Sequence, residues 1–147
     1  MRIIEEKLQW EKPVDGYQYK IKPSEQTPEG DAQLIYKNAD ETIEEVRSVL
    51  LAHGLQLGDR IVQLNEFYPN GRGLDEEVGE GMRKGVGTSV LADLEVRAIA
   101  QGAKAVYAFS MKPSMQSFLK KMGFEVFGPK NCHHIKILEK QTGETTS

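Results

Sequence analysis

The chain has 147 residues, of which 28% are charged and 39% are hydrophobic, and its formal net charge is −3. Such values are typical of one globular domain with a real core, and they give no overall attraction to nucleic acid or to an anionic membrane. The apolar runs are too short to span a bilayer, and the acidic start of the chain does not have the form of a secretory signal.

Cysteine usage adds a prediction about location and metal chemistry. The chain has one cysteine, Cys132, which excludes an internal disulfide and favours the reducing cytoplasm. His133 and His134 follow it directly, but one thiol and two adjacent imidazoles lack the spacing of a metal site. We therefore expect no bound metal, and a cytoplasmic location.

The first third of the chain predicts short strands. Residues 3–10 mix apolar and charged side chains. Residues 17–22 alternate clearly between apolar and polar side chains and end at Pro23, and residues 32–37 are a third candidate strand. A polar loop over residues 24–30 separates the second and third segments.

One amphipathic helix is predicted to begin near residue 40. Asp40 is a good N-cap, Thr42 and Glu45 offer an alternative capping pair, and Gly54 ends the pattern. The apolar stripe of this helix consists of Ile43, Val46, Val49, Leu50 and His53.

Residues 60–68 predict a strand near the centre of the sheet, and Pro69 follows them. The polar segment that comes next is long for a connection inside a compact domain, and it contains Glu76, Glu77 and Glu80. It is either a solvated insertion or an acidic loop that binds a cationic substrate.

Helices and strands alternate in the second half. We expect a helix over residues 87–101 that Gly102 ends, a buried strand over 105–109, a helix between Pro113 and Gly123, and strands over 124–127 and 132–138. The apolar stripes of the two helices are Val90, Leu91, Leu94, Ala98 and Ile99, and Met115, Phe118, Leu119 and Met122. A strand, a helix and a strand in succession predict a right-handed crossover between parallel strands. The fold class is α/β (α+β), a mixed central sheet of about six to seven strands with about three helices.

The most informative motif covers residues 82–89, Met-Arg-Lys-Gly-Val-Gly-Thr-Ser, where the second helix begins. Gly85 and Gly87 permit a tight turn with exposed N–H groups, and Arg83 and Lys84 add positive charge. The first turn of a helix has unpaired N–H groups, and its dipole favours an anion. The motif therefore predicts a diphosphate site, and its alternative is a turn with exposed basic residues. It ends without the Gly-Lys-Ser/Thr of a Walker-type loop, and valine replaces the last glycine of a dinucleotide fingerprint.

Three features of the second half follow one another in a recognisable order. Residues 82–87 fall on the pattern Arg/Gln-x-x-Gly-x-Gly/Ala and agree with it at both glycines, and a helix and a strand that ends at Phe109 come next. Residues 117–124 then form a helix that ends in Gly-Phe, and residues 133–140 form a last strand. In this order the chain resembles the GCN5-related N-acetyltransferase (GNAT) family over residues 61–140 or so.

The resemblance implies a fold, a ligand and a reaction. The glycine loop would wrap the pyrophosphate of acetyl-CoA, the co-substrate, and the strands on either side of the crossover would splay apart to hold the pantetheine arm. The implied function is transfer of an acetyl group to an amine acceptor, without a metal. Members of the family often dimerise through the edges of their sheets, so a homodimer is also possible. The residues expected to bind acetyl-CoA are Phe67, Arg83, Lys84, Gly85, Val86, Gly87, Thr88, Ser89 and Phe118.

Direct acetyl transfer requires a base for the acceptor ammonium and a donor for the developing oxyanion. Glu66, near the end of the central strand, is the first candidate for the base, and Asp59, at its start, is the second. The Phe67 N–H is a candidate oxyanion donor, and Ser110 and Tyr107 are candidate proton donors to the leaving thiolate.

The chain departs from the family pattern at Met82, where Arg or Gln is usual, and at Leu119, where a general-acid Tyr is common. The first half also matches the family poorly. Two functions therefore stay open: an acetyl-CoA-dependent N-acetyltransferase with an unknown acceptor, and a degenerate CoA-binding module that regulates a protein partner. A third alternative is an α/β domain without a CoA site. We expect one GNAT-like domain over residues 1–140, a flexible polar tail over 141–147, and no nucleic-acid partner.

Overall fold

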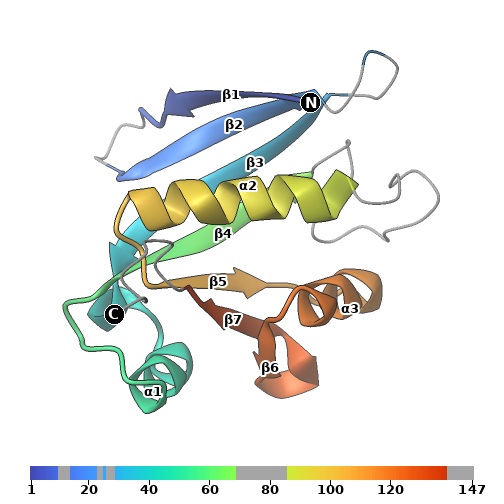
Figure 1. Ribbon diagram of the computed structural model, residues 1–147. Helices are drawn as coiled ribbons and strands as arrows, with labels where there is room; N and C mark the ends of the chain where they lie inside the picture. The colour runs from blue at the N-terminus through green and yellow to red at the C-terminus, as the bar shows by residue number, and fades with distance from the viewer. Residues whose placement is uncertain (10–13, 23–24, 26–28, 69–85, 139–147) are drawn as a thin grey trace, which may run out of the picture.

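A computed structural model describes residues 1–9, 14–22, 25, 29–68 and 86–138. These residues form a seven-stranded sheet with the order β1-β2-β3-β4-β5-β7-β6 (Figure 1). The strands are β1 (Arg2–Lys7), β2 (Gly16–Lys22), β3 (Gly30–Asn38), β4 (Arg60–Tyr68), β5 (Ala105–Phe109), β6 (Glu125–Phe127) and β7 (His133–Ile137). Only β4 and β5 pair in parallel, and the other neighbours are antiparallel. The predicted mixed sheet and its parallel crossover are confirmed.

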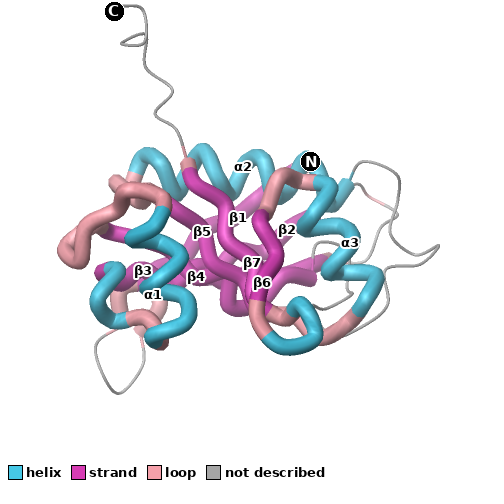
Figure 2. Tube along the Cα trace, turned by 90° about the horizontal axis from the view of Figure 1, so that it is seen from below, coloured by secondary structure: helices cyan, strands magenta, loops and turns pink. Residues whose placement is uncertain are grey.

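In the described part of the chain, three α-helices cover the sheet: α1 (Glu44–Ala52), α2 (Val86–Ala100) and α3 (Pro113–Lys121). Figure 2 shows α2 along the sheet, with α1 and α3 on either side of the strands. The larger core lies on the face that α2 and α3 cover, and it includes Tyr19, Ile21, Leu34, Val62, Leu64, Phe67, Val90, Leu91, Leu94, Met115 and Leu119. The smaller core, which includes Ala39, Val46, Leu50, Ile61, Ala105 and Ile135, joins α1 to the other side. Strands β4 and β5 contribute to both cores, as expected for strands in the middle of the sheet.

The predicted helix ends are confirmed at three glycines. Gly54, Gly102 and Gly123 follow α1, α2 and α3, and their φ angles are +93°, +87° and +96°. Only glycine adopts this conformation without steric cost, so these positions stop the helices. Pro113 is the first residue of α3, where its missing N–H costs nothing.

The start of α1 differs from the prediction. Asn38, and not Asp40, caps the turn, because its backbone N–H donates to Glu41 Oε1 at 2.7 Å around a short 3-10 helix, Ala39–Glu41. The α-helix itself begins only at Glu44.

This later start changes which side chains are buried. Ile43 precedes the helix and is 56% exposed, and His53 follows it and is also exposed, so the predicted apolar stripe was wrong at both ends. The fully buried residues of α1 are Val46 and Leu50.

Phe109, the last residue of β5, is 46% exposed, so that strand is covered on both faces only up to Ala108.

Charged contacts fasten the amino end of β4. Arg60 Nη1 lies 2.7 Å from Asp15 Oδ2, and the guanidinium stacks 4.5 Å from the centre of the Tyr36 ring. Lys7 Nζ lies 3.2 Å from the same Asp15 carboxylate.

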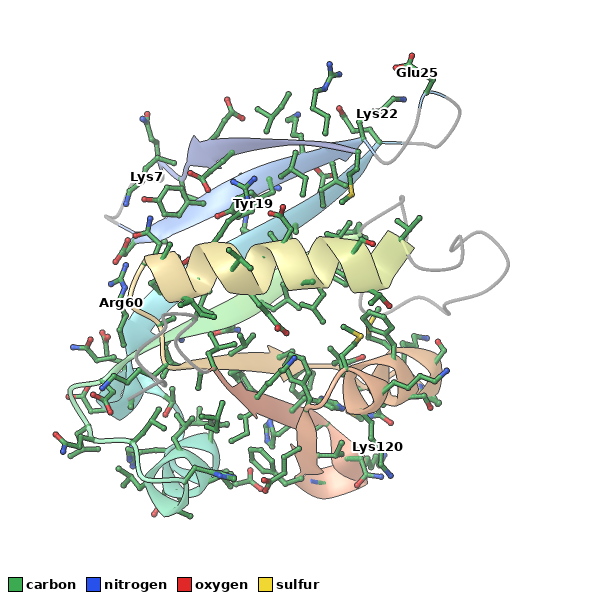
Figure 3. All side chains as sticks on the ribbon, in the orientation of Figure 1. Lys7, Tyr19, Lys22, Glu25, Arg60 and Lys120 are labelled. Atoms are coloured by element: carbon green, nitrogen blue, oxygen red, sulfur yellow. The ribbon has the colours of Figure 1, made fainter. Side chains whose placement is uncertain are left out.

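Figure 3 shows Arg60 and Lys7 on one side of the molecule and Lys22 and Lys120 on the other. The carboxyl ends of β4 and β5 lie on that other side.

Among the residues that the structure describes, no helix combines the length and apolar character that crossing a membrane requires.

Candidate functional site

The parallel pairing of β4 with β5 is short. Its register partners are Val62 with Val106 and Gln63 with Tyr107. Beyond them β4 continues to Tyr68 and β5 continues to Phe109 without pairing to each other. The two strands therefore separate toward their carboxyl ends, as the resemblance implied.

A β-bulge lies on β4 at this separation. The register with β3 moves from Leu34–Leu64 to Gln33–Glu66, which leaves Asn65 as an extra residue. The bulge shifts the alternation of side chains, so Leu64 and Phe67 both belong to the core against α2 and α3. Phe67, and not Glu66, therefore points into that core.

A row of side-chain amides holds the bulge to the sheet. The Asn65 amide donates to Gln33 Oε1, and Gln33 Nε2 donates to Gln18 Oε1 at 2.9 Å. Gln33 is only 5% exposed, and a buried amide without partners would be costly. These bonds link β4, β3 and β2 beside the separation of the strands.

A cleft of about 400 Å³ runs along β4 on the face that α1 covers. It reaches the separation of the strands, because Gln63 and Tyr107, the last paired residues, both contribute to its wall. Three aromatic rings and two opposite charges occur in the wall. The lining residues are Lys37, Glu41, Thr42, Ile43, Val46, Ile61, Gln63, Leu64, Asn65, Tyr68, Tyr107 and Phe109.

The amino end of α2 lies at the same end of the sheet (Figure 1). Its first turn contains Val86, Gly87, Thr88 and Ser89, of which Thr88 and Ser89 are exposed. This turn contains no acidic residue, and the dipole at the amino end of a helix favours an anion. The other predicted loop residues, Arg83, Lys84 and Gly85, lie outside the described part of the chain, as do the three glutamates of the long acidic segment.

Two aromatic rings join the separated end of β4 to α3. Phe67 is fully buried and stacks on Phe118, with 6.0 Å between ring centroids and 18° between ring planes. The structure thus brings together two of the side chains expected beside acetyl-CoA. Leu119 follows Phe118 and is fully buried in the core.

The two acids predicted as bases lie at opposite ends of β4. Glu66 is partly exposed beside the bulge, and among the described residues it does not belong to the cleft wall. Asp59 accepts from the Gln56 N–H at 2.7 Å and lies 3.2 Å from Lys104 Nζ. The bond from Gln56 is the main cause of the lowered pKa of Asp59. Seven residues of extended chain span about 23 Å, so the two carboxylates do not share a site.

The two predicted thiolate donors have different surroundings. Ser110 is fully buried, and its hydroxyl accepts from the Lys112 N–H at 3.2 Å at the start of α3. Tyr107 lies in the cleft wall, and its hydroxyl is 2.8 Å from His133 Nδ1. Burial raises the pKa of Tyr107 to about 12, so its hydroxyl stays protonated at neutral pH.

The adjacent histidines occupy opposite faces of β7, because successive side chains of a strand alternate. His133 packs against the Tyr107, Phe109 and Phe127 rings, and its Nε2 is 3.3 Å from Glu45 Oε1. His134 is fully buried on the other face, where burial lowers its pKa.

The contact of Tyr107, His133 and Glu45 was missed from the sequence, because it joins three elements whose register no local pattern specifies. The described residues include no group of three or more His, Cys, Asp or Glu side chains placed to hold a metal ion.

Two solved structures share this architecture. An arylalkylamine N-acetyltransferase 2 from Aedes aegypti aligns with a TM-score of 0.52 and 13% identity, over 84% of this chain and 73% of that chain. AtaT, complexed with acetyl-methionyl-tRNAfMet, aligns with a TM-score of 0.51 and 10% identity, over 90% of this chain and 73% of that chain. No protein-family model and no curated protein matches the chain. The chain therefore has a GNAT-like fold, and at these identities the likeness concerns the fold alone.

Proposed function

We propose that this chain is an N-acetyltransferase that moves an acetyl group from acetyl-CoA directly to an amine. The observation that carries the proposal is the separation of β4 from β5, with a cleft along β4 on one face. The amino end of α2, which suits a diphosphate, lies at the same end of the sheet (Figure 1). One fold neighbour is itself named an arylalkylamine N-acetyltransferase, which supports acetyl transfer as the class of reaction.

Acetyl-CoA, in this proposal, binds from the α2 side. Backbone N–H groups around Gly87, Thr88 and Ser89 donate to the diphosphate, and Arg83 and Lys84 add charge. The thioester lies between the separated strands, where the Phe67 N–H is the proposed oxyanion donor and Phe118 lies beside the pantetheine arm.

The amine acceptor enters the cleft that α1 and β4 enclose. Tyr68, Tyr107 and Phe109 give this cleft aromatic walls, which favour an amine on an aromatic or aliphatic body. Holding amine and thioester together supplies much of the rate acceleration. Glu66 stands at this end of β4 and is the base proposed from the sequence.

A second candidate function rests on Leu119. This side chain is fully buried in the core, at the position where the family commonly has a proton-donating tyrosine, and it has no proton to donate. A chain that binds CoA without transferring the acetyl group would then regulate a protein partner. Solvent water can also protonate the thiolate, so Leu119 does not exclude catalysis.

Two measurements on the full chain separate these functions. Calorimetric titration with acetyl-CoA tests binding. Release of free thiol is then followed with tryptamine, spermidine, a lysine-containing peptide and methionyl-tRNA as acceptors. Binding with amine-dependent thiol release supports the transferase, and binding with no release from any acceptor supports the regulatory module. No binding at millimolar acetyl-CoA contradicts both.

The homodimer and the cytoplasmic location stay predictions from the sequence.

A further inference from the structure

Three polar side chains form a connected row behind the cleft wall. The Tyr107 hydroxyl is 2.8 Å from His133 Nδ1, and His133 Nε2 is 3.3 Å from Glu45 Oε1. The residues come from β5, β7 and α1, so the row exists only in the folded chain.

Chemistry fixes the direction of the two hydrogen bonds. An ionised carboxylate only accepts hydrogen bonds, so the proton of a neutral His133 belongs on Nε2, facing Glu45. Nδ1 is then the acceptor for the Tyr107 hydroxyl. A hydroxyl, an imidazole and a carboxylate in this order are the arrangement by which an imidazole takes a proton from a hydroxyl while the carboxylate steadies the resulting cation.

Packing holds the imidazole in this orientation. The centroid of the His133 ring lies 5.8 Å from that of Tyr107, 5.9 Å from that of Phe109 and 5.3 Å from that of Phe127. The His133 side chain is 6% exposed, whereas the Glu45 side chain is 52% exposed. The row thus begins at the cleft, passes through a buried ring and ends in water.

Its inner end is at the place where acetyl transfer is proposed. Tyr107 lines the cleft and is the last β5 residue that pairs with β4. Glu66, in contrast, does not contribute to the described cleft wall. Tyr107 is therefore better placed than Glu66 to receive a proton from an amine in the cleft.

We propose that Tyr107, His133 and Glu45 form a relay that removes the proton of the acceptor ammonium; the inference rests on the proposed transferase function. The ammonium gives a proton to the Tyr107 oxygen while the Tyr107 hydroxyl proton moves to His133 Nδ1. The imidazolium is stabilised by Glu45 and keeps its Nε2 proton, so that Nδ1 can later return its proton to the Tyr107 oxygen.

The remaining steps balance without another reactant. The free amine attacks the thioester carbonyl, a C–N bond forms, and the C–S bond breaks with its electron pair on sulfur. The nitrogen loses its second proton to water in this step. The thiolate takes a proton from the Tyr107 hydroxyl, which regains one from His133 Nδ1, so the relay returns to its starting state and the net release is one proton. Tyr107 is then the catalytic residue, and His133 and Glu45 act through it.

Three substitutions test the relay: Tyr107→Phe, His133→Gln and Glu45→Gln. With acetyl-CoA and the fastest of the four acceptors named above, the first two should lower kcat about a hundredfold with little change in the amine KM. Glu45→Gln should lower kcat less than the other two substitutions, because the carboxylate acts only through the His133 ring. The titratable groups in direct contact with His133 are Tyr107 and Glu45, and Cys132 and His134 adjoin it in the chain.

The chain offers a matched control in a second histidine–glutamate pair. His53 Nε2 lies 2.7 Å from Glu125 Oε1, and both side chains are exposed. His53→Gln and Glu125→Gln should keep the wild-type kcat and pH profile. Melting temperatures of all variants show whether each one is folded.

A measurement without turnover examines the same geometry. Nitrogen-15 spectra of the histidine rings in the free protein should show His133 with its proton on Nε2 and with Nδ1 unprotonated. Tyr107→Phe should shift the Nδ1 signal. A proton on Nδ1 would overturn the relay, as would folded Tyr107→Phe and His133→Gln variants with wild-type kcat. If the relay fails one of these tests but the wild-type protein still acetylates an amine, the proposed transferase function is unaffected. If the wild-type protein does not bind acetyl-CoA, the transferase function itself is refuted.

Discussion

His134 shows how one buried side chain makes the stability of this protein depend on pH. It is the register partner of Ala108, and it is fully buried on the face that α2 and α3 cover. Burial lowers its pKa below the ordinary 6.5, and nearby backbone groups of Ala108 and Cys132 offset only part of the shift. The folded chain therefore holds this imidazole in its neutral form.

The sign of the effect follows from proton linkage. Below pH 6.5 the unfolded chain binds a proton at His134 more readily than the folded chain, so folding free energy is lost as the pH falls. As the pH falls from about 7.5 to about 5, wild type should therefore lose unfolding free energy that His134→Leu keeps, so the difference between them should change in favour of the variant. Urea unfolding at these pH values measures the difference, and a difference that stays constant with pH contradicts the prediction.

The residue scale also shows the limit of reading this sequence alone. Gly54, Gly102 and Gly123 were predictable because each requirement is local: a helix that stops needs a residue that tolerates positive φ. The contact of His133 with Glu45 could not be predicted from the sequence, because it joins residues 88 positions apart. Glu45 entered the sequence analysis only as a capping residue for its own helix.

At the scale of elements, the first turn of α2 supports a prediction in which stability and binding move in opposite directions. Thr88 is exposed in this turn, which has no acidic residue. Thr88→Glu places a negative charge at the helix amino end, which should stabilise the fold by about 0.3–1 kcal/mol. The same charge repels the diphosphate and should weaken acetyl-CoA binding at least about tenfold.

Thr88→Gln is the matched control, since it has the same shape without the charge. It should bind acetyl-CoA more tightly than Thr88→Glu in calorimetric titration, and it should lack the gain in unfolding free energy. Equal affinities for the two variants would show that the diphosphate does not lie near this turn.

The bulge on β4 supports a second prediction at this scale. Deletion of Asn65 would restore regular alternation and leave Phe67 opposite Ala32, in the core in which it is now fully buried. The deletion loses the amide bond to Gln33, so it should cost about 1–3 kcal/mol and leave the chain folded.

Asn65→Ser is the control for the deletion. It keeps the bulge and loses only the amide bond to Gln33, so it should cost about 1–3 kcal/mol. Urea unfolding compares the two variants, and a deletion that costs about 3–5 kcal/mol, as loss of a buried phenylalanine does, would show that Phe67 has left the core.

Elements were predicted better than their irregularities. Strand β4 and helix α2 match the predicted segments within one residue, because their hydrophobic periods are long and clear. The bulge could not be recognised from the sequence of β4 alone, because an extra residue is defined only by its register with the partner strand. The start of α1 was misjudged because a separate 3-10 turn, Ala39–Glu41, comes first, and the α-helix then begins after Ile43 without a side-chain cap.

At the scale of the whole molecule, the resemblance anticipated the mixed sheet and the separation of two parallel strands. The wall of the cleft was beyond the sequence, since it combines residues of β3, α1, β4 and β5 with the segment that leads into α1. Their proximity results from strand order and from the packing of α1, which are properties of the complete sheet.

The whole molecule should also report the binding of its proposed co-substrate. A ligand that binds only the folded chain stabilises it by RT ln(1 + [L]/Kd), which is about 2.7 kcal/mol at a hundred times Kd. For a domain of 147 residues this corresponds to an increase in Tm of about 5–10 °C. Acetyl-CoA and CoA should both give this increase because they share the diphosphate, and AMP, which lacks it, should give much less. A Tm unchanged at millimolar acetyl-CoA would contradict a site between β4 and β5, whichever residue removes the proton.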